Sequence, residues 1–253
     1  MLIILSPAKN MGMSPKSKIP AGTTPGFKAE AEYLVSKLQS YSREQLQLLL
    51  QISNKLTDTN YERYQQFNDP STPSIPAILA YTGNVFQHIR PETFTGEDYR
   101  YAQDRLRIIS TLYGLLRPLD LIHAYRLIYQ VRIQGIKEKD LYEYWQPRLT
   151  KPLLKDIKNS GNILINLASL DILGALQMEK IEKEVRVITP EFKEFRKGKH
   201  ETIRTYAKMA RGEMTRYILQ NRIEEPEQIK KFTWEDFSFK EELSDESHYI
   251  FTK

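Results

Sequence analysis

The sequence lacks cysteine entirely: none of its 253 residues is one. Disulfides, thiolate chemistry, iron–sulfur clusters and cysteine-based zinc sites are therefore excluded. Histidine is also scarce, and the four histidines are scattered along the chain, which disfavours a metal site built from them. Neither a G-x-G-x-x-G motif nor a Walker phosphate loop is present. We therefore expect no metal and no cofactor.

Long apolar runs are missing too. No stretch approaches the roughly 20 residues of a membrane span, and the N-terminal run Met1–Leu5 lacks the positive leader of a signal peptide. We expect no membrane association. The 40% hydrophobic and 27% charged residues are typical of a globular protein. Because no repeat or linker divides the chain, residues 1–253 are predicted to form one domain.

Positive charge, in contrast, is concentrated in two blocks. Arg100–Arg132 holds six arginines and no lysine against two aspartates, and Lys193–Arg222 holds nine basic residues against three glutamates. The blocks carry net charges of +4 and +6, whereas the whole chain carries +5, so the remainder is net negative. Segregated charge of this kind indicates an anionic partner. The alternative is that many of these side chains lie on solvated helix faces.

Apolar runs and helical periodicity alternate along the chain, which predicts a mixed α+β fold. An exposed loop rich in Gly, Pro and Ser is expected at Asn10–Phe27. Two or three helices are predicted within 28–67, and further helices at 97–113, 140–158 and 202–221. Strands are predicted at 2–5, 77–81, 162–168, 185–188 and 248–252.

Polar side chains follow two of the predicted strands. Ser6 and Lys9 come after the first strand, and Asn166 and Ser169 close the most apolar one. Residues at the carboxyl ends of strands line crevices in open sheets, so these side chains are candidates to bind an anion. Ser6 and Lys9 also fit the S-x-x-K spacing of penicillin-binding enzymes, but that serine should open a long helix, which disfavours acyl-enzyme chemistry. The alternatives are a surface turn for Ser6 and a helix cap for Ser169.

The segment Leu112–Asp120 is predicted to form a helix, a tight turn and a second helix. Gly114 permits the turn, and Pro118 suits the first position of the second helix. Such a hairpin offers backbone N–H groups to a phosphate, much like the helix-hairpin-helix element that binds duplex backbone. An ordinary corner between two helices is the alternative. Leu115 and Leu119 are predicted to be buried, with a functional arginine, Arg117, between them.

Several longer motifs resemble the YaaA peroxide-stress protein family of bacteria. They are SPAKNM (6–11), ISNKL (52–56), STLYGLLRPLDLIHAYRL (110–127), KDLYEYW (139–145), NILINLAS (162–169) and TYAKMARGEMTRYIL (205–219). They follow the family's order over nearly the whole chain. The resemblance implies a central mixed β-sheet or half-barrel core wrapped by helices, including a helix-hairpin-helix-like element. It also implies a cytoplasmic protein that limits free iron and oxidative DNA damage, and that binds double-stranded DNA through a positively charged cleft with weak sequence preference.

Nine basic residues are candidates for this DNA- or anion-binding surface, because lysine and especially the planar fork of arginine suit phosphate contacts. We predict that the two charged blocks meet on one surface, and that three polar residues also line the cleft. The basic candidates are Lys9, Lys55, Arg107, Arg117, Arg126, Lys199, Lys208, Arg211 and Arg216, all but Lys199 at positions matching the family, and the polar ones are Ser6, Asn166 and Ser169.

Three positions depart from the family pattern. Asn84 and Ile128 stand where acids are common, and the acidic position after Ser169 is shortened to Asp171. Hydrolysis assisted by a metal or by general acid–base groups needs paired carboxylates, so these departures favour binding over catalysis. The alternative function is an enzyme acting on a small phosphorylated or nucleotide-like substrate in the same cleft. Direct iron handling is a weaker third hypothesis, because no cluster of histidines or soft ligands is present.

Overall fold

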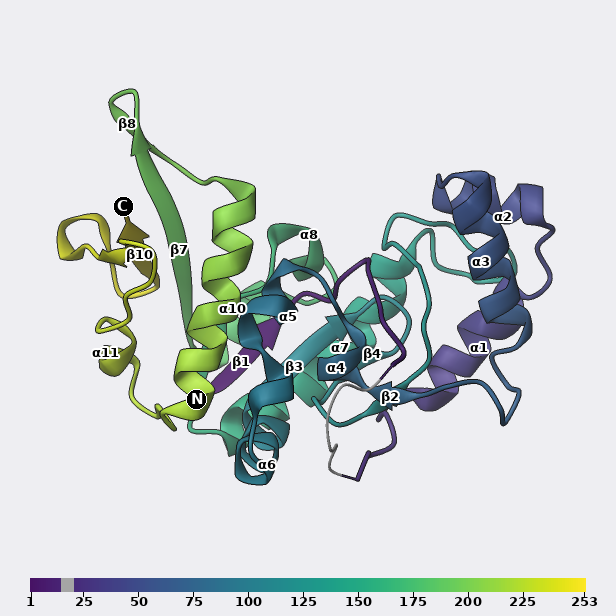
Figure 1. Ribbon diagram of the computed structural model, residues 1–253, viewed down its shortest axis with the longest axis horizontal. Coiled ribbons are helices and arrows are strands. Elements are labelled where there is room, and N and C mark those ends of the chain that lie inside the picture. Colours follow the sequence, from purple (N-terminus) through teal and green to yellow (C-terminus); the bar gives the residue numbers. More distant parts are fainter. Residues whose placement is uncertain (15–20) are drawn as a thin grey trace.

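The computed structural model describes residues 1–14 and 21–253, so positions 15–20 of the predicted loop Asn10–Phe27 lie outside the described residues. An eight-stranded mixed sheet forms the centre (Figure 1), with the order β4-β3-β1-β6-β7-β10-β9 and with β8 paired to β7. Its strands are β1 (Leu2–Leu5), β3 (Leu106–Ser110), β4 (Gly114–Leu116), β6 (Ile163–Asn166), β7 (Arg186–Arg196), β8 (Lys199–Glu201), β9 (Ser238–Phe239) and β10 (His248–Thr252).

The middle of this sheet is parallel and buried. β3, β1, β6, β7 and β10 run in the same direction, whereas β4, β8 and β9 pair antiparallel to their neighbours. β1 reads LIIL and β6 reads ILIN, the near-continuous apolar runs that a parallel sheet covered on both faces requires. The predicted mixed α+β class is confirmed, and the order that ends at β4 and β9 is that of an open sheet, not a barrel.

Helices surround the sheet, and a lobe made of α1, α2 and α3 extends to one side (Figure 1). A separate two-stranded ribbon joins β2 (Ile75–Pro76) to β5 (Leu121–Ile122). The helices are α1 (Lys28–Leu38), α2 (Arg43–Leu50), α3 (Asn54–Gln65), α4 (Ala77–Ala80), α5 (Asn84–Ile89), α6 (Gly96–Arg105), α7 (Leu141–Asn159), α8 (Leu170–Leu173), α9 (Met178–Glu184), α10 (Arg204–Gln220) and α11 (Pro226–Ile229), with 3-10 turns η1 (Pro91–Thr93) and η2 (Glu241–Leu243).

The predicted helix–turn–helix at Leu112–Asp120 is wrong. The chain instead forms a β-hairpin in which β3 pairs antiparallel with β4, so Ser110 lies opposite Gly114. The helix predicted for 97–113 ends at Arg105, because the next five residues, LRIIS, are completely buried against β1 and β4. Leu115 and Leu119 are buried as predicted. The predicted strand at 77–81 is the short helix α4.

The order of strands reverses at β1. The chain passes from β1 to its neighbour β3, and later crosses back to β6 on the other side of β1. In open α/β sheets, ligands bind outside the carboxyl ends of the strands at such a reversal. The carboxyl ends of β1 and β6 are therefore the first place to look for a functional site.

Candidate functional site at the carboxyl ends of the strands

Two serines meet where β1 and β6 end. The Ser6 and Ser169 Oγ atoms lie 3.0 Å apart, and the Ser169 backbone N–H donates to Ser6 Oγ at 2.8 Å. Ser169 precedes α8, but its side chain makes no capping bond, so the helix-cap alternative does not describe it. Both residues are half-exposed. Lys9 is exposed four residues after β1, on the same turn of chain as Ser6.

Asn166 supports the loop that carries Ser169. Its side chain is buried, its Nδ2 donates to Thr189 Oγ1 at 3.2 Å, and its Oδ1 accepts from the Ala168 N–H at 3.2 Å. The first bond ties the end of β6 to β7, and the second folds the loop that carries Ser169. Asn166 therefore positions the loop, while Ser6 and Ser169 face outward.

Arg211 lies on α10, which packs against both α5 and β7. The next residue, Gly212, sits so close to α5 that a Cβ there would be 2.2 Å from the Val85 carbonyl oxygen. The start of α5 in turn presses on the segment after β1, because a Cβ on Gly83 would be 2.8 Å from the Ala8 Cβ. On the other side, Arg211 interacts electrostatically with Glu191 of β7.

The Arg211 side chain is partly buried. Burial lowers the pKa of its guanidinium, and the nearby Glu191 carboxylate partly opposes this shift. Its Nε–H is buried and has no hydrogen-bond acceptor among the described residues. Buried polar groups nearly always have a partner, so this donor makes Arg211 a candidate to bind an acceptor.

A basic surface adjoins this site. β7 and β8 form a hairpin that projects beyond the sheet beside the start of α10 (Figure 1). Its two-residue turn is Lys197-Gly198, and both residues have positive φ (48° and 81°), which is the geometry of a type I′ turn. The exposed cations of the hairpin and of the first two turns of α10 are Arg196, Lys197, Lys199, Arg204 and Lys208.

Acids only partly neutralise this surface. Arg196 pairs with Glu194 and Lys199 with Glu201, each at 2.6 Å. Lys197, Arg204 and Lys208 have no ion pair among the described residues. Exposed ion pairs are weak, so a phosphate competes readily for Arg196 and Lys199. The basic hairpin, which means residues 195–208 from here on, keeps a net positive charge.

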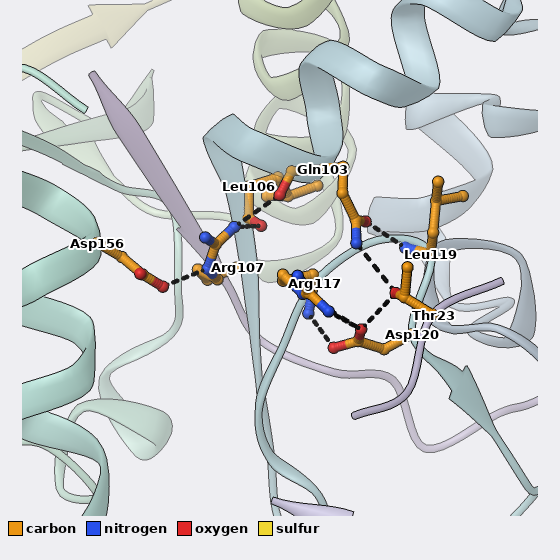
Figure 2. A network of polar contacts seen from close by, with 8 residues as sticks. All are labelled: Thr23, Gln103, Leu106, Arg107, Arg117, Leu119, Asp120 and Asp156. Atoms are coloured by element: carbon orange, nitrogen blue, oxygen red, sulfur yellow. Dashed lines mark hydrogen bonds and ion pairs between the residues drawn. The ribbon is translucent and has the colours of Figure 1, made fainter. Parts of the chain in front are cut away.

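Two of the predicted phosphate-binding arginines belong instead to a structural network (Figure 2). Arg107 is buried in β3, where Nε donates to Asp156 at 2.7 Å and Nη1 donates to the carbonyl oxygens of Gln103 and Leu106. Arg117 packs along the almost fully buried carboxylate of Asp120, which also accepts a hydrogen bond from Thr23.

Arg105, Arg107 and Arg117 of the first basic block lie near the amino end of β3. Arg117 follows β4 and is level with the amino-terminal half of β3. Arg105 lies at the amino end of β3 and pairs with Glu224, which comes just after the end of α10. The end of α10 therefore lies near the amino end of β3, and the first half of α10 lies toward the carboxyl ends of the strands. The prediction that Arg107, Arg117, Arg126, Lys208 and Arg211 share one surface is therefore wrong, since Arg107 is buried in β3.

The other candidates are dispersed. Arg216 donates to the carbonyl oxygens of Ile89 and Arg90 and to Thr93 Oγ1, which anchors α10 to the end of α5. The Arg126 side chain is half-buried, and its carbonyl oxygen accepts from Tyr64. Lys55 is exposed on α3, in the helical lobe. Arg216 and Lys55 therefore do not add to the site at the strand ends.

The three positions that depart from the family pattern lie on different elements. Asn84 is exposed at the start of α5, Ile128 is half-buried against the core, and Asp171 is exposed in α8. Asp120 is held in the network of Figure 2 by hydrogen bonds from Thr23 and from the Arg117 backbone N–H. Within residues 1–14 and 21–253, no group of three His, Asp or Glu side chains is placed to hold a metal.

Sequence reasoning missed the hairpin, and it did not include the exposed Lys197 and Arg204 among the candidate residues. The predicted strand at 185–188 is too short, because β7 continues to Arg196. The residues after 188 alternate between buried and half-exposed, as in a strand with one half-exposed face. The Lys197-Gly198 pair between two strand-like segments was the available signal for the turn. The structure also contains no helix long and apolar enough to cross a membrane in the part of the chain that it describes.

Comparison with known proteins gives a clear family. The family model described as "Peroxide stress protein YaaA" matches residues 1–243. A UPF0246 protein of Bacteroides fragilis is 50% identical over 252 residues, covering 100% of this chain and 98% of that protein. A UPF0246 protein of Parabacteroides distasonis is 46% identical, with 99% of both chains covered, and one of Clostridium beijerinckii is 40% identical, with 100% and 98% covered.

Proposed function

This chain belongs to the family of the peroxide stress protein YaaA, and we propose that it protects DNA in the cytoplasm during peroxide exposure by binding the duplex backbone through the basic hairpin. The observation that carries this proposal is the gathering of five exposed cations on a projecting hairpin and the adjoining helix. A flexible line of lysines and arginines suits an extended row of phosphates better than it suits an enclosed substrate.

The contacts are expected to be with phosphates and not with base edges. Lysine ammonium groups act as point charges, and hydrogen bonds to phosphate carry no sequence information. The helix-hairpin-helix element that the sequence suggested has no part in this proposal, because its residues form the β3–β4 hairpin.

The test is the salt dependence of duplex binding, measured by fluorescence anisotropy. Five phosphate contacts give a slope of log K against log salt of about −4.5. Replacing Lys197 and Lys199 together by alanine should make the slope less steep by about 2. Two duplexes of unrelated sequence should bind with similar affinity. A slope near zero, or binding of one duplex alone, contradicts the proposal.

Lys155→Ala is the matched control. Lys155 is an exposed lysine without an ion pair in the described residues, and it lies on α7, close to where that helix leads into the amino end of β6. The variant removes the same charge from the opposite end of the sheet. Its slope should equal that of the unmodified protein, which separates a local surface from a general effect of net charge.

A further inference from the structure

The strand-end site differs from the basic hairpin in what it can hold. The Nε–H of Arg211 is buried, so the backbone of a rigid duplex has no access to it. The residue as a whole is half-buried. A small molecule can take the Nε–H and an Nη–H together, as the planar fork of arginine allows.

The two serines supply a further donor. Two hydroxyl groups carry two O–H bonds, and the contact between Ser6 and Ser169 uses one of them. Ser6 Oγ already accepts from the Ser169 backbone N–H, which fixes the orientation of the pair. Neither hydroxyl has another partner among the described residues, so one O–H is left to donate outward.

The charge of the surroundings selects the ligand. Arg211 and the exposed Lys9 are positive, and the Glu191 carboxylate that interacts with Arg211 is already paired with Lys193 at 2.8 Å. A ligand here meets N–H and O–H donors in a net positive environment, which requires an acceptor with negative charge. A tetrahedral oxyanion can accept hydrogen bonds from several directions at once. It therefore suits donors that lie on separate elements, here α10 and the segments after β1 and β6.

We infer that the carboxyl ends of β1 and β6 bind a small, freely diffusing molecule bearing a phosphate group, held by the guanidinium of Arg211 and the hydroxyl pair of Ser6 and Ser169. Asn166 is a positioning residue in this site: its bonds to Thr189 and Ala168 hold the loop that presents Ser169. This site is independent of DNA binding, since none of these groups belongs to the basic hairpin.

The experiment is a calorimetric titration of the full chain with inorganic phosphate, with chloride adjusted to keep the ionic strength constant. Saturable binding of one phosphate per chain is expected. Arg211→Gln should weaken it about tenfold or more, because a hydrogen bond to a charged group is lost. The double variant Ser6→Ala and Ser169→Ala should weaken it severalfold, while its duplex binding stays unchanged.

Two controls make the result decisive. Lys208→Ala, three residues before Arg211 on the exposed face of α10, should keep phosphate affinity while it weakens duplex binding. Acetate in place of phosphate should bind at least tenfold more weakly. If Arg211→Gln does not fold, the double serine variant decides the question alone.

Three outcomes overturn the inference. The first is the absence of saturable heat up to about 10 mM phosphate. The second is equal phosphate affinity in folded Arg211→Gln, in the double serine variant and in the unmodified protein, which identifies an adventitious ion only. The third is acetate binding as tightly as phosphate, which excludes the phosphate class. Each leaves the DNA proposal standing, because that proposal depends on the salt slope.

Discussion

Replacing Arg107 by methionine should destabilise the protein severely without a direct effect on any ligand. The Arg107 side chain is 8% exposed and makes three hydrogen bonds, to Asp156 Oδ2 at 2.7 Å and to two carbonyl oxygens at 2.8 and 2.9 Å. Each bond to a charged donor contributes roughly 1.5–3 kcal/mol. These values do not add, because Asp156 is 29% exposed and regains water. We expect a loss of about 3–5 kcal/mol in the free energy of unfolding, typical of a buried pair that loses one member.

Urea unfolding measures this loss as a lower midpoint with an unchanged slope. In a chain of this size each kcal/mol lowers Tm by about 2–4 °C, so the melting point should fall by about 6–20 °C. Lys155→Ala, on the same helix as Asp156 but exposed, should stay within about 0.5 kcal/mol. If Arg107→Met unfolds like the unmodified protein and loses duplex binding instead, the structural reading of the network in Figure 2 is refuted.

Three further predictions follow from other parts of the molecule. Lys208→Ala should make the salt slope of duplex binding less steep by about 1, and calorimetry should show folding unchanged within about 0.5 kcal/mol. Leu119→Ala should cost about 2–5 kcal/mol in urea unfolding, because this leucine is buried in the core. Burial alone would raise the pKa of Asp98, but hydrogen bonds from Thr95 and Arg222 outweigh it, so the pKa of Asp98 is lowered overall. Its stabilising contribution is thus complete above the ordinary value of 3.8 and lost as the pH falls through the lower folded-state value, so Asp98→Asn should flatten the acid limb of stability against pH.

The parts of the fold that were predicted correctly are those in which the spacing of apolar residues fits either a strand or a helix, but not both. The apolar runs of β1 and β6 and the amphipathic stripe of α10 each permit one interpretation. The segment 106–116 was misassigned, because its arginine and its leucines fit a helix as well as a strand. Only its burial between β1 and the rest of the core decides in favour of β3 and β4.

The candidate site was predictable where it depends on the ends of strands. Ser6 and Ser169 were chosen for their positions after two apolar runs, and the sheet order brings them into contact. The basic residues were less predictable, because sequence shows charge but not its partner. Arg107 pairs with Asp156 from a distant segment, whereas Arg117 pairs with Asp120 three residues later. Neither pairing follows from the charge pattern alone.

The long strand β7 has a consequence for synthesis on the ribosome. Along its length β7 pairs first with β6, then with β10 and finally with β8, yet β10 is made about fifty residues after β7 ends. At roughly 5–20 residues per second, one edge of β7 stays unpaired for about 3–10 seconds. Unpaired strand edges invite pairing with other chains, and charged residues on the edge oppose it. The stretch of β7 that waits for β10 carries the charged residues Glu191 and Lys193, which oppose such pairing in the nascent chain.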